Sequence, residues 1–208
     1  MTIRKYGLLT IIIYVICYFA PALFPTITSA LWATIVFYLG GALLLAWLYH
    51  ISQTTLTFES KPKPWKTIII WGVAGIFLAI FVQNIASQIE VSVLGEASSS
   101  QNTNTILSFI KSNYLFILAV SVGGPILEEF VFRRALIGLL ETKIPLWFAV
   151  IVSSLVFAII HDDGHILLYT ALGLVFSMLY IKTGRIWTSI ISHVGMNTLV
   201  VVVSLFMT

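Results

Sequence analysis

Three short polar motifs stand in the second half of a chain that is otherwise mostly apolar. They read E-E-F-V-F-R at 128–133, F-A-I-I-H at 157–161 and H-V-G-M-N at 193–197. An ionisable group at the centre of a membrane helix costs about 2.5–3.5 kcal/mol, so such groups usually face a cavity or a partner. Carboxylates, imidazoles and amides are also the groups that move protons and stabilise oxyanions. The motifs therefore indicate a polar, chemically active site within a helical bundle.

The first motif divides its two carboxylates. On a helix, Glu129 and Arg133 are four residues apart, so they share a face and pair. Glu128 projects about 100° away and is left without that cation. We therefore expect Glu129 to be neutralised structurally and Glu128 to be free to act as a base. The alternative is an ion-pair cluster that only anchors a helix end.

The other two motifs repeat the spacing of four. Phe157 and His161 share one helix face, and the alternative is a histidine that only packs or hydrogen-bonds. His193 and Asn197 share another face, with Gly195 between them allowing a close approach of helices. The alternative there is a polar contact that merely joins two helices.

Hairpin geometry relates the first two motifs. In an antiparallel hairpin that turns near Ile144 and Pro145, Glu128 and His161 are equidistant from the turn and therefore level. His193 fits less simply. Bringing it to the same depth requires the stretch 162–164 to lie inside the bundle, lining a wet cavity.

The sequence H-D-D-G-H at 161–165 has the histidine spacing of the zinc-protease motif H-E-x-x-H. The glutamate is replaced by Asp162, and Gly164 is typical of a turn and not of a helix. We therefore expect no zinc site of that kind. His165, Asp162 and Asp163 are predicted in a loop or at a cavity rim.

The composition predicts a membrane protein. Hydrophobic residues make up 59% of the 208 positions and charged residues 9%, against about 25% charged in an ordinary soluble domain. The fold is predicted to be all-α, a polytopic bundle with an intramembrane polar cavity. About seven spans of roughly 20 residues are expected, at 6–24, 29–49, 67–87, 106–127, 145–161, 166–182 and 186–206. We expect one domain overall, in which 1–105 supplies N-terminal spans and 106–208 the catalytic core.

The few charges predict an orientation. Threading seven spans from a cytoplasmic N-terminus puts most basic residues at cytoplasmic ends: Arg4, Lys5, Lys61, Lys63, Lys66, Lys143, Lys182 and Arg185. The polar loop 88–105, with Glu90 and Glu96, is then external, and Lys111 is the exception. This asymmetry follows the positive-inside rule, so the net charge of +3 indicates a lipid bilayer and not nucleic acid. The only cysteine, Cys17, excludes an internal disulfide.

The three motifs, in this order on successive membrane helices, resemble the CPBP family. This is the group of CAAX prenyl proteases and bacterial bacteriocin-processing or self-immunity proteins, also called the Abi family. The resemblance covers roughly residues 120–205 and includes T-G-R-I-W at 183–187. One departure is Arg134, where the family commonly carries glycine.

The resemblance implies an intramembrane endopeptidase of a bacterial cytoplasmic membrane, with a cavity open toward the cytosol. Glu128 would activate a water, His161 and His193 would position it, and Asn197 would hydrogen-bond the oxyanion. Glu129 with Arg133 would brace the first motif, and Phe157 supports the second. No cofactor-binding residues are implied apart from a metal site.

Whether a metal takes part is open from the sequence. His161, His193 and Glu128 could hold Zn²⁺ or another divalent ion. The same residues could also work without metal, and an asparagine suits oxyanion stabilisation better than zinc ligation.

Two other functions fit the same composition. One is a non-catalytic bacteriocin-immunity or scaffold protein. The other is a small proton-coupled transporter, although no internal symmetry supports it. The expected partner is a peptide or membrane-protein substrate of unknown identity. The oligomeric state is open, because the pairs Gly40-Gly41 and Gly123-Gly124 permit close helix contacts within or between chains.

Overall fold

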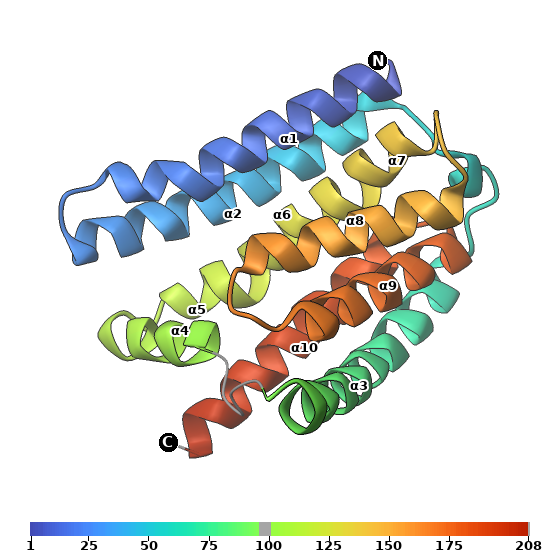
Figure 1. Ribbon diagram of the computed structural model, residues 1–208. Coiled ribbons are helices and arrows are strands. Elements are labelled where there is room, and N and C mark those ends of the chain that lie inside the picture. The colour runs from blue at the N-terminus through green and yellow to red at the C-terminus, as the bar shows by residue number, and fades with distance from the viewer. Residues whose placement is uncertain (96–100, 208) are drawn as a thin grey trace.

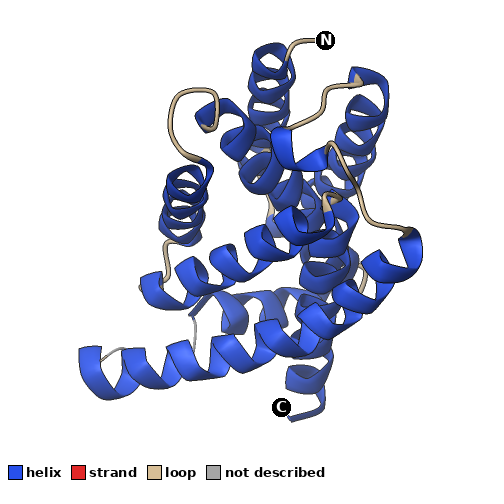
Figure 2. Ribbon diagram, turned by 90° about the vertical axis from the view of Figure 1, so that its right-hand side faces the viewer, coloured by secondary structure: helices blue, strands red, loops and turns tan. Residues whose placement is uncertain are grey.

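A computed structural model describes residues 1–95 and 101–207, and all regular structure in those ranges is helical (Figure 2). The longer helices are α1 (Ile3–Phe19), α2 (Ile27–Ser52), α3 (Trp65–Ile89), α4 (Gln101–Ser112), α8 (Leu146–His161), α9 (Ile166–Thr183) and α10 (Ile186–Met207). Short α-helical pieces are α5 (Phe116–Leu118), α6 (Gly124–Glu128) and α7 (Ile137–Leu140). The 3₁₀ turns are η1 (Ala20–Leu23) and η2 (Thr57–Glu59), and the π-helical segments are η3 (Glu90–Leu94), η4 (Ala119–Gly123) and η5 (Glu129–Leu136). The prediction of an all-α fold is confirmed.

Local sequence signals fix several helix ends. Thr26 and Ser29 form a capping box at the start of α2. Pro145 stands directly before α8, because its missing N–H costs nothing there. Asp162 (φ 46°) ends α8 and Gly184 (φ 65°) ends α9 in the left-handed conformation. These stops keep α8, α9 and α10 as separate helices joined by short turns.

The expected count of seven spans is wrong. Five helical stretches of the described chain are long and apolar enough to cross a membrane: Ile3–Leu23, Ile27–Ser52, Trp65–Val93, Ile166–Thr183 and Ile186–Phe206. α8 is apolar but has only 16 residues, fewer than the roughly 20 that a bilayer crossing needs. The expected span 106–127 starts inside α4, and a break at Asn113 separates α4 from the next helix.

From Phe116 to Leu140 the chain is helical without interruption, alternating between α and π turns. Four ionisable residues lie in this stretch: Glu128, Glu129, Arg133 and Arg134. All four follow the end of the expected span 106–127, in the polar part of this helical stretch. The predicted loop 88–105 is also shorter than expected, because η3 extends to Leu94 and α4 begins at Gln101. Glu96 lies outside the described residues.

α1 and α2 pair along one side of the bundle and α3 lies on the other, with α8 and α10 between them (Figure 1). α3 packs closely on α10. At Gly195 a side chain would meet Ile76, and the Ser192 hydroxyl donates to the Gly72 carbonyl at 2.9 Å. Gly123 lies directly against Tyr38 of α2. The small residues at these places are used for helix contacts within this chain.

One end of the bundle gathers the N-terminus and several loops. The Met1 amino group donates to the Ser52 carbonyl at 3.1 Å, and the Lys63 amide donates to the Thr183 carbonyl at 2.8 Å. Thr57 donates through its hydroxyl to Glu141 at 3.1 Å. The eight basic residues that the sequence grouped together lie in the loops of this end or in the adjoining terminal turns of α1, α3 and α9. We call this the basic end of the bundle.

A buried ion pair holds the loop after α2 onto the core. The guanidinium of Arg134 meets the Glu59 carboxylate with Nε at 3.2 Å and Nη2 at 3.3 Å, and it lies between the rings of Tyr6 and Tyr49. The hydroxyl of Tyr180 also donates to Glu59. Two-point guanidinium–carboxylate contacts are among the stronger ion pairs. Arg134, which departs from the family pattern, therefore has a defined structural partner.

Replacing Arg134 by methionine is expected to destabilise the fold by about 3–5 kcal/mol, because it leaves Glu59 buried without its cation. Replacing both Arg134 and Glu59 by methionine should recover most of that loss. Denaturant unfolding in detergent micelles measures both values. A double variant as unstable as the single one would contradict this explanation.

Candidate active site

The first motif lies where an α-helical turn changes into a π-helical one. Glu128 is the last residue of α6, and Glu129 begins η5. π-helical turns are rare and often occur at functional sites, because i→i+5 bonding shifts side chains relative to a regular helix. Glu129 and Arg133 are both 0% exposed, whereas the Glu128 side chain is 20% exposed. The two adjacent carboxylates therefore have different surroundings, as predicted.

Four charged and polar side chains form a continuous chain of contacts. Arg133 Nε lies 3.7 Å from Glu129 Oε1, and the same oxygen lies 2.9 Å from His193 Nδ1. His193 Nε2 then lies 3.7 Å from Glu128 Oε2. The predicted Glu129–Arg133 pair is present. The contact of Glu129 with His193, 64 residues away, was not predicted.

The contact with Glu129 determines which ring nitrogen of His193 carries the proton. In a neutral imidazole with Nδ1–H donating to a carboxylate, Nε2 carries the lone pair. The ring is buried and stacks on Phe176 with centroids 4.4 Å apart. The gap of 3.7 Å between Nε2 and Glu128 is too long for a direct hydrogen bond. Glu128 Oε2 and His193 Nε2 are thus two neighbouring acceptors that a water beside them could contact together.

The Phe157 ring joins the motifs. It lies 4.4 Å from the His161 ring and 6.1 Å from the His193 ring, and the Arg133 guanidinium lies 4.4 Å from its centroid. Its carbonyl lies 2.8 Å from His161 Nδ1. A neutral His161 therefore also presents Nε2 as an acceptor.

Tyr169 of α9 packs against the His161 ring. The two rings stack with centroids 3.9 Å apart, and the Tyr169 hydroxyl donates to Asp163 at 3.0 Å. Sequence reasoning did not identify Tyr169, because no motif links it to His161. The stack limits rotation of the imidazole.

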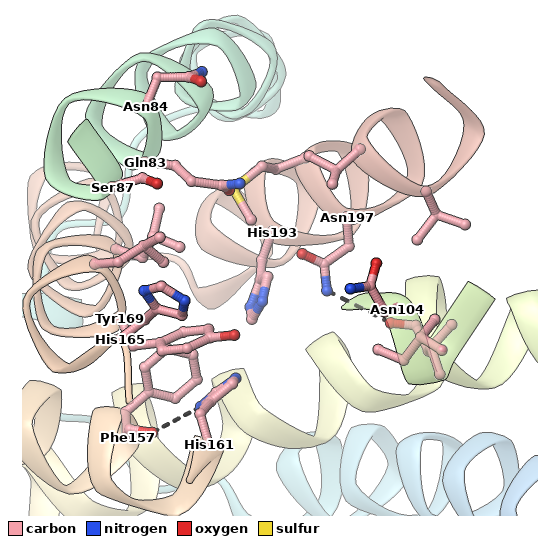
Figure 3. Close-up of a pocket in the computed structure, with 17 residues that line it drawn as sticks. Gln83, Asn84, Ser87, Asn104, Phe157, His161, His165, Tyr169, His193 and Asn197 are labelled. Carbon is pink, nitrogen blue, oxygen red and sulfur yellow. Dashed lines mark hydrogen bonds between the residues drawn. The ribbon is translucent and has the colours of Figure 1, made fainter. Parts of the chain in front are cut away.

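Two cavities adjoin at this site. The first has a volume of about 330 Å³ and lies among α3, α4, α8, α9 and α10, with His193 and Asn197 in its wall (Figure 3). The second, of about 270 Å³, is lined by Glu128 with Tyr14 and Tyr38 from α1 and α2. His161 and Asn197 line both cavities. The predicted residues therefore gather where the two spaces meet.

Asn197 lies one turn beyond His193 on α10. Its Nδ2 donates to the Val120 carbonyl of η4 at a long 3.5 Å, and the side chain is half-buried. An amide N–H at the cavity wall with a weak partner is available to a charged oxygen. The alternative reading of this motif, a polar contact between helices, is also present, because Asn197 joins α10 to η4 and His193 joins α10 to η5.

The structure also answers the question of depth. Glu128 and His161 line the same cavity, as their equal distance from the turn predicted. His193 reaches them through the packing of α10 against η5. This does not require the stretch 162–164 to lie inside the bundle. Asp162 and Gly164 are exposed, so the expectation of a buried loop is wrong for these two residues. Because Asp162 and Gly164 (φ 86°) have left-handed backbones, 161–165 is not helical and cannot form the zinc-protease motif.

A zinc site needs three protein ligands directed at one point. Within the ranges that the structure describes, no group of three or more His, Cys, Asp or Glu side chains is arranged to hold a metal ion. His161 and His193 each commit Nδ1 to another group, and only His193 Nε2 approaches Glu128. The residues therefore do not fit a preformed zinc site.

The chain is similar to known proteins over most of its length. It is 41% identical over 178 residues to the putative membrane peptidase YdiL of Bacillus subtilis (strain 168), which covers 85% of this chain and 72% of YdiL. Residues 110–199 match the family model described as type II CAAX prenyl endopeptidase Rce1-like. The chain belongs to the Rce1-like CAAX prenyl endopeptidase family.

A second relative extends this result. The membrane-embedded CAAX protease MroQ of Staphylococcus aureus (strain USA300) is 32% identical in an alignment of 220 positions, which covers 96% of this chain and 89% of MroQ. No solved structure matches the chain. The resemblance drawn from the three motifs is confirmed, and this Rce1-like protein is a multi-pass membrane protease with a protein substrate.

Proposed function

We propose that this chain hydrolyses a peptide bond of a membrane-associated substrate with a water activated by Glu128. The observation that carries the proposal is the contact chain from Arg133 through Glu129 and His193 to Glu128, at the meeting point of two cavities. It provides one structural carboxylate, one oriented imidazole and one partly exposed carboxylate. This is the combination that general-base catalysis needs.

The proposed reaction has three steps. A water between Glu128 and His193 Nε2 gives a proton to the Glu128 carboxylate as its oxygen attacks the scissile carbonyl carbon. His193 Nε2 accepts a hydrogen bond from the other hydrogen of this water, and His161 lines both cavities beside it. The carbonyl π electrons move to oxygen, and Asn197 Nδ2 donates to the oxyanion. When the C–N bond breaks, Glu128 returns the proton to the leaving nitrogen.

The two cavities support an extended substrate on both sides of the scissile bond. The first is rich in amides and imidazoles, with Gln83 and Asn84 in its wall, and the second is rich in tyrosines. All proposed catalytic groups lie within 106–208, while the spans of 1–105 supply walls. The family and one relative, MroQ, are named for CAAX segments, in which a cysteine is followed by two aliphatic residues and a final residue. A CAAX-like C-terminal peptide is the first substrate to test.

The test is peptide cleavage by purified protein in detergent. Wild type, Glu128→Ala and His193→Ala are incubated with fluorogenic peptides, including prenylated and unprenylated CAAX sequences, with and without a chelator. Cleavage only by wild type, at the same rate with chelator, is the expected result. Equal cleavage by all three proteins would overturn the assignment, and chelator sensitivity would overturn the metal-free mechanism.

Asn197→Leu is expected to lower kcat by about 10²–10³-fold with little change in KM, because the oxyanion forms only in the transition state. Thr198→Val on the next position of α10 is the matched control, since its hydroxyl bonds only its own helix at Val194. Steady-state kinetics of both variants measures the difference. A rise in KM at constant kcat would instead place Asn197 in ground-state binding.

We further propose that the basic end faces the cytoplasm, by the positive-inside rule. The first cavity then lies toward the opposite face, because His161 ends α8, His165 precedes α9 and Ser87 is near the end of α3. This reverses the expectation of a cavity open to the cytosol. Peptide would enter from the extracytoplasmic side.

Cysteine labelling tests this orientation in a Cys17→Ser background. Ser112→Cys, at the end of α4, should react with a membrane-impermeant maleimide in intact cells. Lys61→Cys, at the basic end, should react only after lysis. The reverse pattern would invert the topology.

A further inference from the structure

A second carboxylate–imidazole pair lies outside the three motifs. His165 Nδ1 is 2.8 Å from Glu90 Oε2, and the two residues are 4% and 1% exposed. They come from different helices, because Glu90 opens η3 after α3 and His165 directly precedes α9. The sequence placed Glu90 in an external loop and His165 in a loop or at a cavity rim. The structure buries both.

Glu90 uses its two oxygens differently. Oε1 accepts the backbone N–H of Leu168, in the first turn of α9, at 3.1 Å. This is a capping interaction, favoured at a helix N-terminus. Oε2 meets His165 Nδ1, so a neutral imidazole carries its proton there and keeps a lone pair on Nε2. The Glu90 carboxylate and the Leu168 N–H are sufficient to join the end of α3 to α9. The buried imidazole of His165 is not needed for this contact, so its presence calls for a separate explanation.

His165 forms part of the wall of the first cavity, together with His161 and His193 (Figure 3). Its surroundings there include Gln83 and Ser87 of α3. Glu128 does not line this cavity. His165 thus lies in the space assigned to substrate, on the side away from the proposed base.

We propose that His165 binds the substrate peptide, with Nε2 accepting a hydrogen bond from a backbone N–H, and that Glu90 fixes the tautomer that makes this possible. The inference rests on the proposed function. His165 is a binding residue and Glu90 a positioning residue. Neither exchanges a proton with the reacting atoms, so both act on affinity.

The sharpest variant is Glu90→Gln. Its amide oxygen can still accept the Leu168 N–H, but its NH₂ group must donate to His165 Nδ1. The imidazole proton then moves to Nε2, which becomes a donor. Shape and capping are retained while the hydrogen-bonding character of the cavity wall is reversed. A role limited to helix packing would tolerate this change. His165→Leu removes the imidazole altogether.

Binding is measured in a Glu128→Gln background, with the library peptide that this protein retains most tightly, labelled with a fluorophore. Fluorescence polarisation gives Kd for the parent, Glu90→Gln and His165→Leu. A series of the same peptide, N-methylated at one amide at a time, is then titrated against the parent and His165→Leu. Thermal melting in detergent identifies variants that have lost their fold. If His165→Leu is unfolded, the methylated peptides are compared on the parent and Glu90→Gln instead.

The expected result is a Kd raised about tenfold in both variants, which corresponds to about 1.4 kcal/mol. One N-methylation should weaken binding to the parent about tenfold and leave the variants unaffected. Unchanged Kd values, or identical methylation profiles, would overturn the proposal. Measuring Kd does not require cleavage of the peptide. A peptide that binds but is never cleaved by wild type would therefore contradict the proposed function, while the Kd values would still test the role of His165.

Discussion

Glu128→Gln is expected to lower kcat for peptide cleavage by about 10²–10⁴-fold, the range that a general base contributes. The amide keeps the size of the side chain but cannot accept the proton of the attacking water. Glu128 is the less buried of the adjacent carboxylates and has no cation in contact, so the fold should be retained. Steady-state kinetics with equal amounts of folded protein measures the loss.

Asp162→Asn is the matched control, because this carboxylate is exposed beside the site at the end of α8. It should keep wild-type kcat. If Glu128→Gln retained most of its activity, the base would have to be another group, and Glu129 would be the first to consider.

Glu129→Gln is expected to lower kcat to a similar extent for a different reason. A glutamine at this position donates to His193 Nδ1 through its NH₂ group, so the imidazole proton moves to Nε2 and the water loses one acceptor. In serine proteases the analogous exchange of the orienting aspartate for asparagine lowers kcat about 10⁴-fold. The removal of a negative charge also leaves Arg133 buried without its ion-pair partner.

Two readouts separate these consequences. Unfolding in detergent should show a destabilisation of about 3–5 kcal/mol from the unpaired Arg133. kcat per folded molecule should fall independently of that loss. Lower stability with unchanged kcat per folded molecule would make Glu129 purely structural. Glu90→Gln, which reverses the tautomer of His165, should change affinity and not kcat, so the two glutamine variants test different histidines.

The grouping of the candidate site residues was partly predictable because each motif is local. Spacings of four place Glu129 with Arg133, and Phe157 with His161, on a shared helix face whatever the tertiary structure is. That Glu128 and His161 lie at the same distance from the turn also followed from one short hairpin. These relations hold over a few turns of helix, where sequence distance and spatial distance agree.

Other features depend on contacts that no local pattern reveals. Glu59 with Arg134, and Glu90 with His165, are each 75 residues apart in sequence. No local pattern of the sequence predicted the π-helical turns η4 and η5, and η5 carries Glu129, Arg133 and Arg134. The one signal in the sequence was a charged residue in an apolar segment with no oppositely charged residue nearby. Such a residue is expected to have a partner in the folded protein, but the sequence does not say which one.

The most direct test of the proposed hydrolysis uses mass spectrometry of peptides cleaved in H₂¹⁸O. Purified wild type and Glu128→Gln are incubated side by side with the same CAAX-containing library. Wild type should generate new C-termini that carry one ¹⁸O atom, at sites that the variant leaves intact. Labelled products at the same sites and rates with Glu128→Gln would contradict the role of Glu128 as the base that activates water.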